Sequence, residues 1–204
     1  MSTRTPSQAW QEMLRGNERF IEGAPQHPRQ DVERREELAF KQEPDAALFG
    51  CSDSRLAAEI IFDKGIGDLF VVRNAGQIIS ESVLGSLEYA VGILHVPLIV
   101  VLGHDECGAV LAAIDATKPD AAKLPPHIAN LVAKIVPAVK RVAARGAVDS
   151  SEVGREHLRD TISELIESSE LISDAIAAGT LAIVGANYRL LEGTAIADIH
   201  VGNL

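Results

Sequence analysis

The chain has 204 residues, 47% of them apolar, which is enough for one well-filled core and one domain, or two at most. Its formal net charge of −10 argues against a nucleic-acid partner or an anionic membrane, because both would need clustered Lys and Arg. No apolar run reaches the length of a membrane span, and the polar residues 1–20 contain no signal-peptide core. With only two cysteines, we expect a cytoplasmic protein whose thiols are reduced.

Residues 1–45 predict a helical arm ahead of the first strand. Thr5 and Pro6 are typical of a helix start, and apolar side chains recur at helical spacing until Gly23. A charged helix is predicted over 31–41, after a Pro-rich connector. Such an arm must cover apolar surface either on its own domain or on a partner subunit, and we favour the partner.

Apolar, strand-like runs alternate with helix-like segments through the rest of the chain. Strands are predicted at 46–49, 69–72, 98–102 and 180–186, with a terminal hairpin from 188–191 and 194–199. Helices are predicted at 56–62, from an N-cap at Ser82 to about 94, at 107–116, 127–145 and 151–178. The linker 118–126 is too short to divide domains. We therefore predict a single α/β domain over 1–204, with a mainly parallel central β-sheet flanked by helices and an antiparallel edge strand or hairpin at the C-terminus.

Two short polar runs, 50–55 and 103–108, each follow an apolar strand and lead into a helix. Ligands of parallel α/β sheets bind at the carboxyl edge, so both runs should open onto one crevice. Cys51, His104 and Cys107 form a soft ligand set suited to zinc, and three protein ligands leave a fourth position for water. A disulfide between the two cysteines is the alternative, and a reducing compartment disfavours it.

Asp53 and Arg55 extend this hypothesis. A carboxylate two residues after a ligand could reach the fourth position, and Arg55 could hold it by two hydrogen bonds. Two thiolates cancel the charge of a dication and acidify its water less than three imidazoles would, so a fixed Asp53 would help by orienting the hydroxide. Alternatively, the pair is an ordinary exposed ion pair, or Asp53 is a fourth ligand that closes the site.

Four segments together resemble the β-class carbonic anhydrases, and the bacterial members in particular. They are Cys-Ser-Asp-Ser-Arg at 51–55, Phe-Val-Val-Arg-Asn at 70–74, Glu-Tyr-Ala-Val at 88–91 and Gly-His-x-x-Cys-Gly at 103–108. The resemblance runs from about Gln42 to Gly108 and more loosely to the end. It implies one Zn2+ per chain held by Cys51, His104 and Cys107, with catalytic Asp53 and Arg55. It also implies a homodimer or homotetramer with sites near the subunit interface.

The same resemblance suggests a substrate pocket and a reaction. Gln42, Phe70, Ala75, Tyr89 and Gly108 occupy positions that in plant-like members bind carbon dioxide or bicarbonate. The implied reaction is reversible hydration of carbon dioxide, by attack of a zinc-bound hydroxide that Asp53 orients. A regulatory bicarbonate site of the kind found in one subtype is not expected, because Leu48 replaces its tryptophan, although Arg73 and Tyr188 match its other two residues. Closure of Asp53 onto zinc at low pH is left open.

Three alternatives remain. A metal-free enzyme could use Cys51 as a thiolate nucleophile with Arg55 gripping an anion, but His104 and Cys107 would then have no role. Relatives of the family hydrolyse carbonyl sulfide or carbon disulfide at a zinc site, and pocket size decides between these substrates and carbon dioxide. In a structural protein the zinc would be closed by Asp53.

The remaining histidines have no predicted catalytic role. We expect His27, His127 and His157 at the surface, His95 at a helix end and His200 at an interface. No histidine is placed clearly enough to be a proton shuttle.

Overall fold

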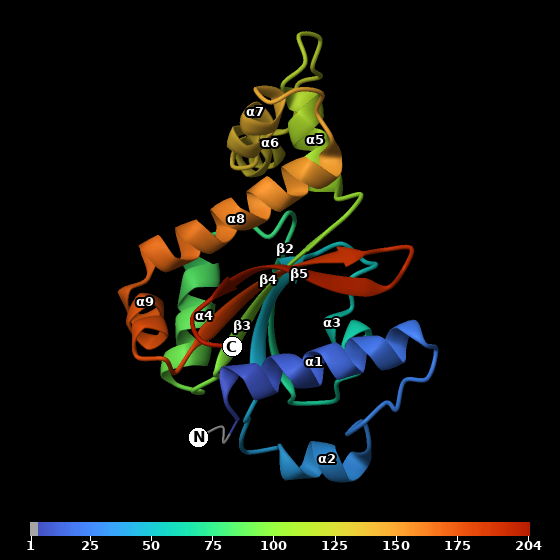
Figure 1. Cartoon of the computed structure of the whole chain (residues 1–204), viewed down its shortest axis with the longest axis vertical. Helices are drawn as coiled ribbons and strands as arrows, with labels where there is room; N and C mark the ends of the chain where they lie inside the picture. The colour runs from blue at the N-terminus through green and yellow to red at the C-terminus, as the bar shows by residue number, and fades with distance from the viewer. Residues whose placement is uncertain (1–3) are drawn as a thin grey trace.

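A five-stranded sheet with the order β2-β1-β3-β4-β5 forms the centre of the molecule (Figure 1). The structure is a computed structural model that describes residues 4–204. The parallel strands are β1 (Ala46–Cys51), β2 (Leu69–Asn74), β3 (Leu98–His104) and β4 (Ala182–Arg189), and the antiparallel edge strand is β5 (Thr194–Val201). The predicted α/β fold, with an antiparallel strand at one edge, is confirmed.

Both faces of the sheet are covered by helices, which explains why β1 and β3 are apolar without alternation. On one face, Phe49 and Val101 belong to a core shared with α4 (Glu81–Gly92), α8 (Ser150–Ser168) and α9 (Glu170–Ala177). On the other face, Leu48 and Val100 pack with residues of α1 (Pro6–Ile21) and α3 (Ala58–Ile61). The sheet is therefore buried on both faces and holds the loops at the ends of its strands in fixed positions.

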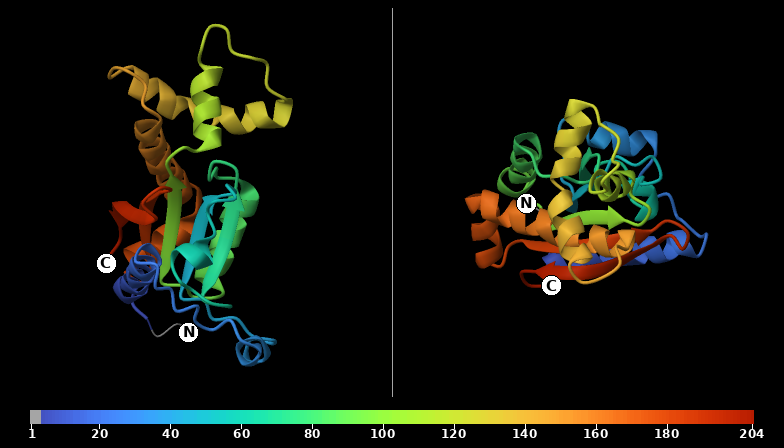
Figure 2. Two further views of the ribbon diagram at one scale, coloured as in Figure 1. Left: turned by 90° about the vertical axis from the view of Figure 1, so that its right-hand side faces the viewer. Right: turned by 90° about the horizontal axis from the view of Figure 1, so that it is seen from above.

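Three helices stand beyond the carboxyl ends of the parallel strands (Figures 1 and 2). They are α5 (Gly108–Ala116), α6 (Pro126–Ala133) and α7 (Val136–Ala143), and α8 returns from them across the sheet. Their apolar residues Val110, Val132 and Val139 are buried in the same core as residues of α1. We call these three helices the helical lobe. The lobe lies at the same end of the sheet as the two polar runs, 50–55 and 103–108. Among the described residues, no helix is long and apolar enough to cross a membrane.

Two predicted long helices are each broken in the structure. The segment 127–145 divides into α6 and α7, because Pro137 has no N–H to continue the α6 hydrogen-bond ladder. The segment 151–178 divides at Ser169, which adopts an extended backbone and accepts a hydrogen bond from the Ile172 N–H.

Two other boundaries also differ from the prediction. The N-cap residue of α4 is Ser80, with an extended backbone, and Ser82 lies inside the first turn. Tyr188 continues β4, so the hairpin is formed by the end of β4 and the whole of β5 rather than by a separate strand from 188 to 191. The parallel pairing with β3 extends to Tyr188 and explains the longer strand.

The N-terminal helix α1 packs on its own chain, against β5 and α3. The Thr5 side chain accepts a hydrogen bond from the Gln8 N–H, and the Gln8 side-chain oxygen accepts one from the Thr5 N–H. Trp10 and Met13 are buried in the core. By contrast, α2 (Val32–Glu37) has no buried residue, and Phe40 after it is fully exposed. Packing of this outer part of the arm on a partner subunit stays a prediction.

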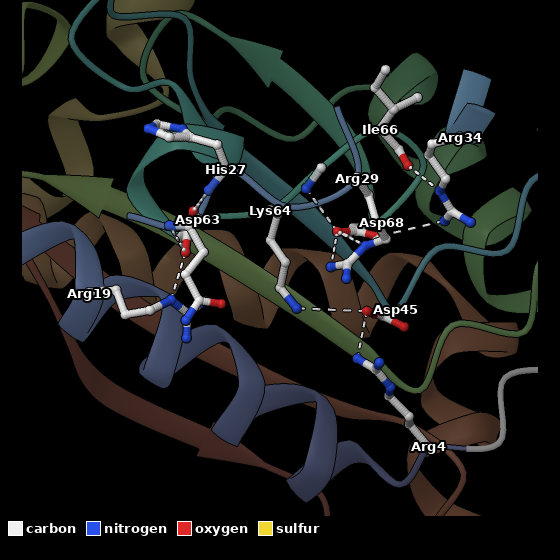
Figure 3. Close-up of polar contacts among 12 residues, drawn as sticks. Arg4, Arg19, His27, Arg29, Arg34, Asp45, Asp63, Lys64, Ile66 and Asp68 are labelled. Carbon is white, nitrogen blue, oxygen red and sulfur yellow. Dashed lines mark hydrogen bonds and ion pairs between the residues drawn. The ribbon is translucent and has the colours of Figure 1, made fainter. Parts of the chain in front are cut away.

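A polar clasp fastens the connector between α1 and α2 to the loop before β2, and we define it as Arg19, Arg29, Asp63 and Asp68 (Figure 3). The buried Asp63 carboxylate accepts hydrogen bonds from Arg19 Nε at 2.6 Å and from the backbone N–H groups of residues 26 and 27. Asp68, also buried, accepts from Arg29 Nε at 2.8 Å. These bonds satisfy two carboxylates that would be costly to bury alone.

Candidate metal centre

Three side chains that could bind a metal meet where the central strands end. Cys51 is the last residue of β1, His104 is the last residue of the neighbouring β3, and Cys107 precedes the first residue of α5. Their ligand atoms all lie within 4.8 Å of one another, and all three residues are buried. Both cysteines are free thiols, so the disulfide alternative does not describe this structure. The parallel pairing of β1 and β3 brings the motifs together as the sequence predicted.

The ring of His104 is oriented as a metal ligand would be. Its Nδ1 lies 2.7 Å from the backbone oxygen of Asp105. Because a carbonyl oxygen only accepts, Nδ1 carries the hydrogen and Nε2 carries a lone pair. That Nε2 is buried without a hydrogen-bond partner among the described residues. A buried lone pair facing two sulfurs fits a bound cation, with the backbone carbonyl fixing the tautomer.

The two thiols perturb each other in opposite directions. A hydrogen bond from Cys107, followed in size by the effect of His104 and the backbone N–H of Gly76, lowers the pKa of Cys51. The contact with Cys51, together with burial, raises the pKa of Cys107. Two adjacent sulfurs cannot both carry a negative charge without a neighbouring cation. The pair is therefore suited to releasing its last proton when a dication binds.

Asp53 and Arg55 form the bidentate pair that their spacing predicted. Arg55 donates from Nε to Asp53 Oδ1 at 2.8 Å and from Nη2 to Oδ2 at 2.7 Å. These hydrogen bonds lower the pKa of Asp53, so it is ionised at neutral pH. Arg55 Nη2 also donates to the backbone oxygen of Glu106 at 3.1 Å, which ties the first motif to the second. Asp53 is not part of the cluster of converging ligand atoms.

Arg73 braces the first motif from the neighbouring strand β2. It donates from Nε to the backbone oxygen of Cys51 at 2.9 Å and from Nη2 to that of Asp53 at 2.6 Å. In the sequence analysis, Arg73 belonged to the 70–74 segment that resembles the family and matched a residue of a regulatory site, but it was given no bracing role. Its position at the carboxyl end of β2, next to β1, is the signal that could have identified this bracing role.

The terminal hairpin holds the second motif. The Asp105 carboxylate accepts from the Leu190 N–H at 2.9 Å and pairs with Arg189 at 3.3 Å. The Asp105 N–H donates to the Tyr188 carbonyl. The residue whose backbone oxygen orients the His104 ring is thus fixed on both sides, which the sequence did not reveal.

The predicted substrate residues fall into two groups. Ala75 and Gly108 are exposed and adjoin the metal-centre loops. Apart from the neighbouring residues and the backbone of its own helix, no described atom lies within 4 Å of a Cβ built at Gly108. Gln42 precedes the first residue of β1, and Cys51 is its last residue. The two therefore lie toward opposite ends of this strand. Tyr89 shares a surface hollow with Gln42, and its ring centroid is 6.1 Å from that of Phe70. Within one chain, Gln42, Phe70 and Tyr89 are therefore distant from the thiols of Cys51 and Cys107.

The sequence of this chain is similar to carbonic anhydrases. Residues 46–195 match the family model described as carbonic anhydrase. The chain is 48% identical over 208 aligned positions to carbonic anhydrase 2 of Mycobacterium tuberculosis, covering all of this chain and 98% of that protein. It is 44% identical to a carbonic anhydrase of Mycolicibacterium smegmatis, with the same coverage.

Solved structures place the chain within one class of this family. A structure of tetrameric β-carbonic anhydrases from the ascomycete Sordaria macrospora superimposes with a TM-score of 0.72 at 25% identity, covering 82% of this chain and 87% of that one. A second β-carbonic anhydrase, CcaA, superimposes with a TM-score of 0.69 at 25% identity over 95% of this chain. With its converging Cys51, His104 and Cys107, the chain belongs to the β-class carbonic anhydrases.

Proposed function

We propose that this chain catalyses the reversible hydration of carbon dioxide to bicarbonate and a proton, using one Zn2+ bound by Cys51, His104 and Cys107. The observation that carries the proposal is the burial of these three ligand atoms within 4.8 Å of one another, in a chain that aligns over its full length with carbonic anhydrases. Two sulfurs and one imidazole nitrogen suit zinc better than they suit magnesium or calcium.

The residues of the chain have separate parts in this reaction. Zinc, when bound, would supply Lewis acidity that makes hydroxide available near neutral pH. Asp53, ionised and held by Arg55, accepts the hydrogen of the attacking oxygen and so directs a lone pair toward the substrate carbon. Arg55 keeps the carboxylate from turning, because both of its oxygens are engaged. Ala75 and Gly108 leave room for a small apolar substrate beside the sulfurs.

We further propose that the substrate pocket is completed by a second copy of the chain in a homodimer or homotetramer. Three of the predicted substrate residues, Gln42, Phe70 and Tyr89, lie close to one another. They lie toward the opposite ends of the strands from Cys51 of the same chain, so they would contribute to the site of a partner subunit. The fully exposed Phe40 beside Gln42 supports a covered surface there. The Sordaria macrospora relatives are described as tetrameric. In that assembly Gln42 would donate a hydrogen bond to a substrate oxygen on which negative charge grows.

We also propose a cytoplasmic location. Two free thiols that must stay reduced to bind a metal are best kept in a reducing compartment.

Two measurements on the purified protein test the reaction together. Metal analysis should give about one zinc per chain, in line with its single described three-ligand cluster. Stopped-flow indicator traces should show carbon dioxide hydration that becomes faster as pH rises. A folded, zinc-loaded protein without hydration at any alkaline pH would contradict the proposal. Carbonyl sulfide and carbon disulfide should be assayed alongside, because hydrolysis of these with no carbon dioxide hydration would assign the site to sulfur analogues.

A further inference from the structure

The buried His157 lies behind the metal centre, contrary to the expectation that it is a surface residue. It is 3% exposed on α8, on the face that also buries Leu158 and Thr161. His157 is buried because Val153, four residues earlier, and Thr161, four residues later, lie on the same side of the helix and are also buried. This periodicity was the available signal, and the charged neighbours of His157 in the sequence hid it.

His157 makes one hydrogen bond, and its atoms define the tautomer. Nε2 lies 2.7 Å from the backbone oxygen of Gly76, which can only accept, so Nε2 carries the hydrogen. Nδ1 then carries a lone pair and is buried without a partner among the described residues. Burial also lowers the pKa of His157, which keeps the ring neutral.

The bonded residue, Gly76, itself contacts a predicted zinc ligand. Its N–H donates to Cys51 Sγ at 3.3 Å. Its φ of +80° is a left-handed conformation, and a Cβ there would lie 2.9 Å from the Cβ of Ala109. The following Gln77 also has a positive φ, of 41°. Gly76 adopts this conformation without steric cost, whereas Gln77 is strained in it and needs support from outside the loop.

Helix α8 supplies that support through two residues one turn apart. His157 donates to the Gly76 carbonyl. The Thr161 hydroxyl lies 3.3 Å from the Gln77 carbonyl and 2.9 Å from the His157 carbonyl of its own helix. Only the first of these carbonyls belongs to the residue whose N–H reaches the sulfur. The contact from His157 therefore acts on Gly76 itself, whereas the Thr161 hydroxyl has its shorter contact within α8 and touches only the next residue of the loop.

We propose that His157 is a positioning residue of the metal centre, holding Gly76 so that its N–H donates to the sulfur of Cys51. An N–H···S hydrogen bond fixes the direction of the sulfur lone pairs and withdraws charge from a thiolate ligand. Outer partners of this kind typically change metal affinity or activity by roughly 10–100-fold. The inference rests on the metal-binding part of the proposed function, not on the identity of the substrate.

The test compares substitutions of His157 that keep or remove a side-chain N–H facing the Gly76 carbonyl. His157→Gln can place an amide N–H where Nε2 is, whereas His157→Leu removes the donor. Zinc affinity is measured by competition with a chromophoric chelator, and the sulfur-to-cobalt charge-transfer band is recorded after loading with Co2+. We expect His157→Leu to weaken zinc binding roughly 10–100-fold and to shift the band, and His157→Gln to restore most of both.

Thr161→Val is the matched control, because it removes a hydroxyl that contacts the carbonyls of Gln77 and His157 on the same helix and beside the same loop, without touching Gly76. It should leave the cobalt band in place and change zinc affinity by less than about threefold, since the Cys51 contact is intact. The proposal is overturned if His157→Leu binds zinc as the unaltered chain does, or if Thr161→Val shifts the band equally.

A second pair of variants keeps the test open if His157→Leu does not fold. His157→Asn is polar like His157→Gln but its amide is too short to reach the Gly76 oxygen. Equal zinc affinity and equal bands in these two variants would overturn the proposal. Because all readouts are metal affinity and spectra, a chain that binds zinc normally but hydrates no carbon dioxide would refute only the proposed reaction.

Discussion

The two oxygens of Asp53 are both occupied by Arg55, at 2.8 Å from Nε and 2.7 Å from Nη2. The same guanidinium reaches across to the backbone oxygen of Glu106, so it joins the two motifs as well as orienting the carboxylate. Asp53 is thereby held beside the converging ligands without being one of them. In the proposed reaction, this arrangement would separate the orientation of the attacking oxygen from metal binding.

Replacing Asp53 with Asn should lower kcat roughly 10–100-fold and leave about one zinc per chain, because the amide cannot be held as a fixed acceptor by Arg55. Stopped-flow hydration and metal analysis of the same sample measure both quantities. The comparison variant Cys107→Ala should lose the metal. Equal zinc loss in the two variants would contradict the separate roles.

Removing the metal should abolish hydration and expose both thiols to alkylation. A chelator strips the ion, and a chromogenic thiol reagent should then react first with Cys51, whose pKa is lowered, and more slowly with Cys107, whose pKa is raised. The total should be two sulfurs per chain, in line with the two free cysteines. Adding zinc before the reagent should protect both, since a thiolate bound to metal is a poor nucleophile. Activity that survives complete removal of metal, and loss of activity on alkylating Cys51 alone, would favour the cysteine-nucleophile alternative.

Two inactive variants should regain activity when they are assembled together, if a partner subunit supplies Gln42. A mixed dimer of Gln42→Ala and Cys107→Ala chains would contain one complete site: the thiols of the first chain with the glutamine of the second. The variants are unfolded and refolded together, and hydration is compared with that of each variant refolded alone. No gain on mixing, in a sample shown by mass spectrometry to contain mixed dimers, would place Gln42 outside the partner's site.

The polar clasp should make the stability of the protein fall in acid. Burial alone would raise the pKa of Asp63, but the backbone N–H groups of Gln26 and His27, together with Arg19, lower it overall. A lowered pKa in the folded state contributes stability that is fully present above the unfolded value, about pH 4, and is lost as pH falls through the folded pKa. Urea unfolding at several pH values should therefore show a shallower acid dependence for Asp63→Asn, and a lower stability at pH 7.

The control for the clasp is Asp120→Asn in the exposed segment after α5. It should shift the free energy of unfolding by less than about 0.5 kcal/mol at any pH, as is usual for surface substitutions. An acid dependence of Asp63→Asn identical to that of the unaltered chain would show that the clasp does not respond to pH in this way.

Asn17 should be a major contributor to the stability of the α1 packing. Its buried side chain donates to the carbonyls of Ile61 and Gly193 and accepts from the Ala195 N–H. Asn17→Ala leaves three buried backbone groups unpaired, so we expect the free energy of unfolding to fall by about 3 kcal/mol. Urea denaturation measures the change. Arg15→Gln, which breaks an exposed ion pair on the same helix, should cost less than about 0.5 kcal/mol.

The sequence by itself determined the layers and the convergence of the three residues of the candidate metal centre. Unalternating apolar runs such as 98–102 require burial on both faces, and this is sufficient to predict a parallel sheet with helices around it. Cys51 and His104 end such runs, and parallel strands place their carboxyl ends at one edge, so convergence of these residues followed from local pattern. The spacing of Asp53 and Arg55 likewise fixed their pairing, because residues two apart in a tight loop are neighbours whatever the rest of the chain does.

Only the tertiary structure decided which distant groups support these residues. The burial of His157 and its bond to Gly76 depend on α8 crossing the sheet beside a loop that lies 81 residues earlier in the chain. The separation of Gln42 and Tyr89 from the thiols follows from the direction of β1 and α4, which a list of matching motif positions does not contain. Contacts of this kind depend on how whole helices and strands pack against one another. Packing involves side chains from segments far apart in the chain, so a short stretch of sequence does not predict it.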